Sequence, residues 1–334
     1  MGFFVCFSLL WFNQDTVAQQ IALTSRSLGL LESESIDEGA LFDWMKFTIK
    51  EQHSTLNLLM AENEDLRSEL VVLHSMVATS SLELFSAPPT QQRILLVMGH
   101  TQDQKGAVYG ELTEYELNYD LITQLEQDLV TRGCEVIVLH EDGHYSQSFQ
   151  DYFETHEDKI LNFRAQQKEE YAREYPMSVV TNDTDHNYAS KEATIQLYGI
   201  NMWTTENEVD VVIHVHFNDY PGRVWNQVGT HTGFSLFTSL KTNDNFIESF
   251  RLAKLIEQEM LQYANRSTVE KESAGVLESE LIAVGQANSV IVPAVLFEGG
   301  FIYEDKFTNP VQRKKEFTDY TQAIGQAIDR YFNN

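Results

Sequence analysis

The chain has 334 residues and a formal net charge of −27, which results from 50 acidic and 23 basic residues. This charge argues against nucleic acid or an anionic membrane surface as the main partner, because both are polyanions. The length is enough for one α/β domain with an extension. The two cysteines, Cys6 and Cys134, are too few for a disulfide framework or a thiolate-rich zinc site. Any metal must therefore be held by histidine and carboxylate.

The N-terminal stretch, residues 2–12, is almost wholly apolar. It is too short to span a bilayer comfortably, but it has the length of a signal-peptide hydrophobic region. Thr16-Val17-Ala18 offers a cleavage site, although no Lys or Arg precedes the apolar run. We expect residues 1–35 to be a signal or anchor segment with a linker, and the protein to work in the cell envelope, outside the cytoplasm, secreted or anchored. The alternative is a buried N-terminal segment.

Residues 36–88 show a long helical pattern in which one seam recurs in alternating steps of three and four, and no Gly or Pro occurs between residues 41 and 85. The seam consists of Phe42, Met45, Ile49, Gln52, Leu56, Leu59, Asn63, Leu66, Leu70, Leu73 and Val77. A pattern sustained over about five heptads is typical of a coiled coil. The coiled coil predicts self-association or a docking partner; the alternative is an amphipathic helix packed on the domain's own surface.

From residue 92 onward, alternating strand and helix patterns predict an α/β domain with a mostly parallel central sheet flanked by helices. The predicted strands are 93–98, 135–139, 209–217, 234–240 and 290–297, and the predicted helices are 112–132, 246–263 and 310–332. Between them, residues 144–205 are polar and helical in pattern, and we expect a helical insertion. It could form a lid or a substrate-selecting wall, or it could be solvated decoration.

Histidines and carboxylates gather at the predicted strand ends. His100 follows the first strand. Further along the chain, at the start of the next predicted helix, is an acidic cluster of Glu111, Glu114 and Glu116. His214 and His216 are two residues apart on one strand, so both project from the same face. Glu298 is expected to end the last strand, just before Gly299-Gly300. Imidazoles and carboxylates that converge at one sheet edge are the ligands expected of a zinc hydrolase.

These residues resemble the zinc-dependent N-acetylmuramoyl-L-alanine amidases of the amidase-3 family from about residue 93 to the C terminus. The matching motifs are Gly99-His100, Gly106-Ala107 with Glu114, His216-Phe217-Asn218, and the Pro-Ala-Val-Leu-x-Glu-x-Gly-Phe motif at residues 293–301. The chain departs from the family pattern where Thr101-Gln102 replaces a Gly-Gly pair.

The resemblance implies that His100, Glu114 and His216 ligate one zinc ion and that Glu298 is the catalytic carboxylate. The family usually has a small hydroxyl residue where this chain has His214. This histidine, with Asn218 and Arg223, is a candidate for binding substrate or for supporting the ligands.

The implied reaction is zinc-dependent hydrolysis of the amide bond between N-acetylmuramic acid and L-alanine in peptidoglycan. One alternative is another zinc peptidase of related fold, such as a carboxypeptidase, which would need an arginine like Arg223 to hold a terminal carboxylate. A second alternative is an inactive wall-associated scaffold that works through its coiled coil.

Overall fold

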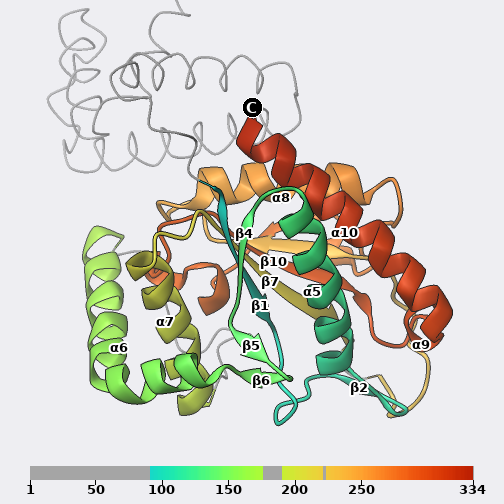
Figure 1. Cartoon of the computed structure of the whole chain (residues 1–334), viewed down its shortest axis with the longest axis horizontal. Helices are drawn as coiled ribbons and strands as arrows, with labels where there is room; N and C mark the ends of the chain where they lie inside the picture. The colour runs from blue at the N-terminus through green and yellow to red at the C-terminus, as the bar shows by residue number, and fades with distance from the viewer. Residues whose placement is uncertain (1–90, 176–189, 221–222, 334) are drawn as a thin grey trace, which may run out of the picture. The chain divides into compact units, whose positions relative to one another are not determined.

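The computed structural model describes residues 91–175, 190–220 and 223–333 (Figure 1). The chain divides into two units, Met1–Pro89 and Thr90–Asn334, and the described residues belong to the second unit. The predicted signal or anchor segment (1–35) and the predicted coiled coil (36–88) lie outside the described residues. Among the described helices, none is both long enough and apolar enough to cross a membrane.

A six-stranded sheet forms the centre of the domain, in the order β4-β1-β7-β10-β8-β9. Its strands are β1 (Arg93–Met98), β4 (Glu135–Val138), β7 (Val211–Asn218), β8 (Ser235–Thr238), β9 (Val276–Glu278) and β10 (Ala294–Phe301). All neighbouring pairs are parallel except β10 and β8, which are antiparallel. The predicted α/β fold with a mostly parallel sheet is therefore confirmed.

Helices cover both faces of the sheet (Figure 1). They are α5 (Glu114–Thr131), α6 (Gln147–Glu174), α7 (Lys191–Glu206), α8 (Phe246–Met260), the short α9 (Asp305–Thr308) and α10 (Pro310–Asn333). On one face, Ile94 and Val215 of the sheet pack in the same core as apolar residues of α5, α8 and α10. On the other face, Leu95 and Val212 pack with residues of α6 and α7, such as Tyr198. Strands buried on both faces explain the continuous apolar runs in the sequence.

Helix α5 illustrates how the local sequence sets an element that carries a site residue. Thr113 is its N-cap and forms a capping box with Glu116, in which each side chain accepts a hydrogen bond from the other residue's backbone N–H. Its leucines recur every four residues and pack in the core. The helix ends before Gly133, whose φ of +96° is the left-handed conformation that glycine adopts readily. These signals place Glu114 in the first turn.

Strand β10 differs from the prediction at both ends. It begins at Ala294 rather than Val290, after Pro293, which has no N–H to give to the sheet. It also continues beyond Glu298 to Phe301, with a register shift between these two residues. The prediction that Glu298 ends the strand was wrong, because the glycine pair allows an irregular pairing, with Gly300 at φ +144°, rather than a turn away from the sheet.

Several short elements escaped prediction because two or three residues show no periodicity. They are the hairpin of β2 (Val108–Tyr109) and β3 (Leu112–Thr113), the hairpin of β5 (His140–Glu141) and β6 (His144–Tyr145), and strand β9 at the edge of the sheet. Three 3₁₀ helices add to these, at Glu270–Glu272, Ile282–Val284 and Gln286–Asn288. The segment 144–205 contains β6, α6 and most of α7, and both helices pack against the sheet face opposite α5.

Candidate metal centre

His100 lies in the loop that leaves the carboxyl end of β1. The N–H of Gly99 donates to the carbonyl of Val215 at 2.9 Å, which holds the start of this loop beside β7. Nδ1 of His100 lies 3.1 Å from the carbonyl oxygen of Gln104. Because a carbonyl can only accept, Nδ1 carries the proton, and Nε2 keeps its lone pair on the side that faces Glu114.

Glu114 is the first residue of α5, and only 5% of its surface is exposed. One carboxylate oxygen, Oε2, accepts from the N–H of Ala107 at 2.9 Å, and the other, Oε1, accepts from the N–H of Phe217 at 3.1 Å. The backbone of Glu114 is fixed as well, because its own N–H donates to the carbonyl of Ala107 at 2.8 Å. A buried carboxylate at a helix N-terminus with two backbone donors is well stabilised in its charged form.

The two histidines meet this carboxylate from different strands. Nε2 of His100 lies 3.3 Å from Oε2 of Glu114, and Nδ1 of His216 lies 3.1 Å from Oε1. One ligand atom from each of these three residues lies within 4.8 Å of the other two, and no other such group of three or more occurs in the described part of the chain. Two imidazoles and one carboxylate at this spacing fit a catalytic zinc ion, which takes three protein ligands and keeps one position open.

Burial and mutual contact set the protonation of this cluster. Burial would raise the pKa of Glu114, but the hydrogen bond from His216 and the charges of both histidines outweigh it and lower that pKa. Burial lowers the pKa of His216, yet its bond to Glu114 and the charges of Glu114 and Glu298 raise it overall. The pKa of His100 is lowered, mainly by burial. The cluster is therefore an ionised carboxylate between two imidazoles, one of which favours the neutral form that binds metal.

Two glycines from the matched motifs leave room for the cluster. A Cβ atom at Gly99 would collide with the ring of His216, and a Cβ atom at Gly106 would collide with Glu114 and His100. Gly106 also has a φ of +69°, where side chains are disfavoured. Steric space therefore explains why glycine precedes His100 and Ala107 in the two motifs.

Glu298 faces the same site from β10. It pairs in register with His216 on the neighbouring parallel strand, so the two side chains lie on the same face of the sheet. Its Oε2 is buried and has no hydrogen-bond partner in the described part of the chain. Burial, opposed by His216 and reinforced by the charges of Glu114 and Glu272, raises the pKa of Glu298 to about 8. A carboxyl group with this pKa can exchange a proton near neutral pH.

The structure separates the alternatives that the sequence left open. Glu116 is committed to the capping box, and Glu111 is exposed in the turn between β2 and β3, so neither joins the cluster. His214 is on the same face of β7 as His216 but is only 1% exposed and packs among core residues. Its Nε2 has no hydrogen-bond partner among the residues that the structure describes, and burial lowers its pKa to about 3. His214 is therefore enclosed in the domain and presents almost no surface to a substrate.

Arg223 is engaged by neighbouring groups of its own loop and of β2. Its guanidinium group forms a bidentate pair with Asp219, at 2.6 and 2.8 Å, and donates to the carbonyls of Gln227 and Val108. Only 5% of its side chain is exposed. Because its N–H donors are used in this way, Arg223 stabilises a loop. Its guanidinium group has no free pair of donors for a substrate carboxylate. Asn218 ends β7, where its carbonyl accepts from Ile302.

Two contributors to the site were missed from the sequence. The carbonyl of Gln104 sets the proton position of His100, and the N–H of Phe217 fixes the Glu114 carboxylate. Both are backbone groups, which every residue carries, so residue type gives no signal for them. Only the loop and strand geometry brings them to the site.

Solved structures of similar fold include three bacterial enzymes. The N-acetylmuramoyl-L-alanine amidase from Clostridium difficile 630 is 16% identical, with 73% of this chain and 98% of that chain covered and a TM-score of 0.47. AmiC2 of Nostoc punctiforme is 12% identical, with 73% and 99% covered and a TM-score of 0.46. Ami1 from Mycobacterium smegmatis is 12% identical, with 72% and 97% covered and a TM-score of 0.48.

A search of curated proteins found no match. The model of one protein family, described as N-acetylmuramoyl-L-alanine amidase, matches residues 94–330 and so covers almost the whole described domain. The chain therefore belongs to the N-acetylmuramoyl-L-alanine amidase family, amidase-3.

Proposed function

We propose that this protein hydrolyses the amide bond between N-acetylmuramic acid and L-alanine in peptidoglycan, with one zinc ion held by His100, Glu114 and His216. The observation that carries the proposal is the convergence of these three ligand atoms within 4.8 Å, beside a carboxyl group of raised pKa, in a chain of this family. Zinc in such a site lowers the pKa of water and polarises a carbonyl group.

The chain's own residues supply the rest of the chemistry. Glu298 would take a proton from the attacking water as general base and would return it to the leaving nitrogen of L-alanine as general acid. Glu298 must be ionised to start this cycle. Its raised pKa belongs to the protein without metal, and a cation on the neighbouring cluster would lower that pKa. The Glu114 carboxylate would keep both histidines oriented through its two backbone donors.

Two further candidate functions are weaker. A carboxypeptidase would need a free arginine for the terminal carboxylate, and the guanidinium of Arg223 is already paired with Asp219. An inactive scaffold would have no need for a complete and well-supported ligand set. We therefore favour amide hydrolysis in peptidoglycan over both alternatives. This function places the protein outside the cytoplasm, where peptidoglycan lies. Docking or self-association through residues 36–88 remains part of the proposal.

The products identify the bond that is cleaved. We expect the full chain, supplied with zinc, to release peptides with a free N-terminal L-alanine from purified peptidoglycan and to leave glycan strands with free lactyl carboxyl groups. Mass spectrometry of the products identifies both the free N-terminal L-alanine and the free lactyl carboxyl group. Release of single C-terminal amino acids would indicate a carboxypeptidase instead, and an absence of any cleavage by the zinc-loaded chain would support the scaffold.

A further inference from the structure

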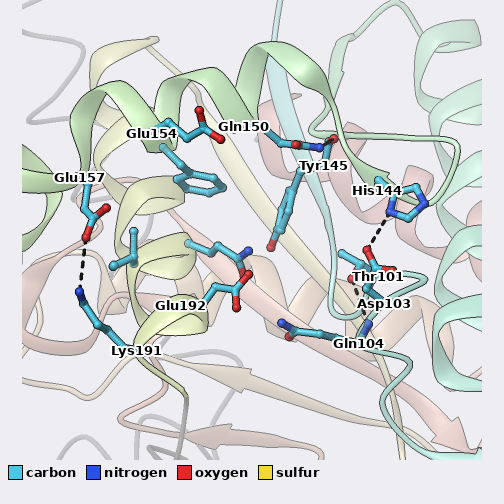
Figure 2. Close-up of a pocket in the computed structure, with 13 residues that line it drawn as sticks. Thr101, Asp103, Gln104, His144, Tyr145, Gln150, Glu154, Glu157, Lys191 and Glu192 are labelled. Carbon is cyan, nitrogen blue, oxygen red and sulfur yellow. Dashed lines mark hydrogen bonds and ion pairs between the residues drawn. The ribbon is translucent and has the colours of Figure 1, made fainter.

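A cavity of about 540 Å³ lies next to the candidate metal centre (Figure 2). Its walls come from the loop that follows His100, which contributes Thr101, Asp103 and Gln104, and from β6 and the first turns of α6 and α7. The two sites share this loop, because the carbonyl of Gln104 accepts the hydrogen bond from His100. The cavity and the metal centre are therefore neighbours along this loop.

The cavity is lined by more acidic than basic groups. Asp103 is paired with His144 at 3.1 Å, and Glu157 is paired with Lys191 at 3.4 Å (Figure 2). The other two carboxylates that line it, Glu154 and Glu192, have no ion-pair partner within the described ranges. The surplus negative charge predicts a cationic ligand.

Apolar and aromatic residues form another part of the wall, beside the uncharged polar residues Thr101, Gln104, Gln150 and Gln196. Tyr145, Phe153 and Ile195 line the cavity between the carboxylates. The hydroxyl end of Tyr145 points into the cavity (Figure 2) and makes no hydrogen bond within the described residues. Burial, together with the charge of Glu192, raises the pKa of this tyrosine, so the hydroxyl stays protonated. A ligand for this wall needs a methylene chain beside its charge, and the aromatic ring suits a cation as well.

The carboxylates are not arranged for a metal ion. They are spread over the loop after His100, α6 and α7, and no three of them offer ligand oxygens within 4.8 Å of one another; among the described residues only the His100, Glu114 and His216 group does so. An extended organic cation fits the spread of charge better than a divalent ion, which needs several oxygens around one point.

We propose that this cavity binds the side-chain ammonium group of a diamino acid in the peptide portion of the substrate, with Glu154 and Glu192 facing the ammonium and with Tyr145, Phe153 and Ile195 along its methylenes. The inference rests on the proposed function, because the amide bond at the metal centre joins the glycan to this peptide. It gives the lining residues of β6, α6 and α7 a role in selecting the substrate.

Peptide binding tests the proposal separately from catalysis. The probes are a stem tripeptide that ends in lysine and the same tripeptide with an acetylated lysine amine, each titrated calorimetrically into the metal-free full chain at low salt. We expect the free amine to bind about 3- to 10-fold more tightly, the range for one or two partly exposed charge pairs. In the Glu154→Gln, Glu192→Gln double variant this preference disappears.

Glu170→Gln is the matched control, since it removes one exposed carboxylate of α6 that does not line the cavity. The preference for the free amine should survive in this control. Equal affinity of the wild-type chain for both peptides, or equal loss of preference in the control and the double variant, would overturn the proposal. A calcium-binding signal that the double variant abolishes would overturn it too. Peptide discrimination without cleavage of peptidoglycan would instead leave the cavity assigned and refute the proposed amidase activity.

Discussion

Glu114 connects most of the groups in the candidate centre. Each of its oxygens faces one histidine and accepts from one backbone N–H. The helix start and the preceding loop hold it in place, so the carboxylate is positioned before any metal binds. Such preorganisation is what a ligand set needs in order to hold one geometry.

Replacing Glu114 by Gln should therefore remove the zinc site at little cost in shape. The amide would place an NH₂ group against one of the two backbone donors, and the negative charge between the histidines would be lost. We expect zinc affinity to fall by about 100-fold or more, since losing a direct ligand should exceed the 10- to 100-fold cost of losing a supporting partner. Zinc titration with a competing chelator measures this.

Glu116→Gln is the control for that experiment. Gln can replace Glu in a capping box, so the helix start should persist and zinc affinity should stay within about 3-fold of the wild type. If both variants lost zinc equally, the assignment of Glu114 as the ligand would be wrong.

The loops next to β1 and α5 position the residues of the candidate metal centre as much as the strands do. The capping box, the apolar spacing of α5 and the strand runs could be predicted from sequence, since each follows a local rule. The irregular pairing after Glu298 and the antiparallel direction of β8 could not, because both depend on how distant segments pack. The glycine pairs marked the motifs, but their steric role emerged only with the side chains in place.

Gly106 provides a test at this scale. In the Gly106→Ala variant, the new methyl group meets Glu114 and His100 and the backbone is strained at φ +69°. We expect a loss of zinc affinity together with a decrease in the free energy of unfolding of about 1 to 3 kcal/mol. Calorimetric zinc titration and urea unfolding measure the two effects.

The Gly110→Ala variant distinguishes the effect of backbone strain from that of a collision with the metal ligands. Gly110 has a similar φ of +62°, but a Cβ atom there would meet nothing within 4 Å. This variant should lose about 1 kcal/mol of stability and keep its zinc affinity. Zinc loss in both variants would point to general loosening of the loop rather than to a steric role for Gly106.

The domain as a whole buries uncharged histidines under one face of its sheet. Both ring nitrogens of His140 are buried, and neither has a hydrogen-bond partner within residues 91–175, 190–220 and 223–333. The ring stacks on Tyr145 with centroids 4.5 Å apart. Burial lowers the pKa of His140 to about 3, and the pKa of His214 is also lowered to about 3. The sequence suggested a site role for His214 on a buried strand, and the fold shows how completely this histidine is enclosed.

These histidines make stability depend on pH in a defined direction. In the unfolded chain a histidine takes up a proton below a pKa of about 6.5, whereas the folded chain leaves His140 neutral down to about 3. The free energy of unfolding should therefore fall as the pH decreases from about 6.5 to about 3. Each such histidine contributes about 1.4 kcal/mol per pH unit within that window.

The variant His140→Phe removes one titrating histidine. The slope of the unfolding free energy with pH should therefore decrease by about 1.4 kcal/mol per pH unit. Urea unfolding of the metal-free protein at several pH values between 4 and 7 measures it. An unchanged slope in His140→Phe would show that His140 is not held neutral in the fold.

The central claim is that Glu298 moves the proton at a zinc centre built by His100, Glu114 and His216. The direct measurement is the rate at which N-terminal L-alanine appears from purified peptidoglycan, compared between the wild-type chain and Glu298→Gln after each has been shown to hold one zinc ion. We predict that the variant retains its zinc and that its rate is about 10²- to 10⁴-fold lower, the usual contribution of a general acid-base group. Equal rates in the two zinc-loaded proteins would contradict the account.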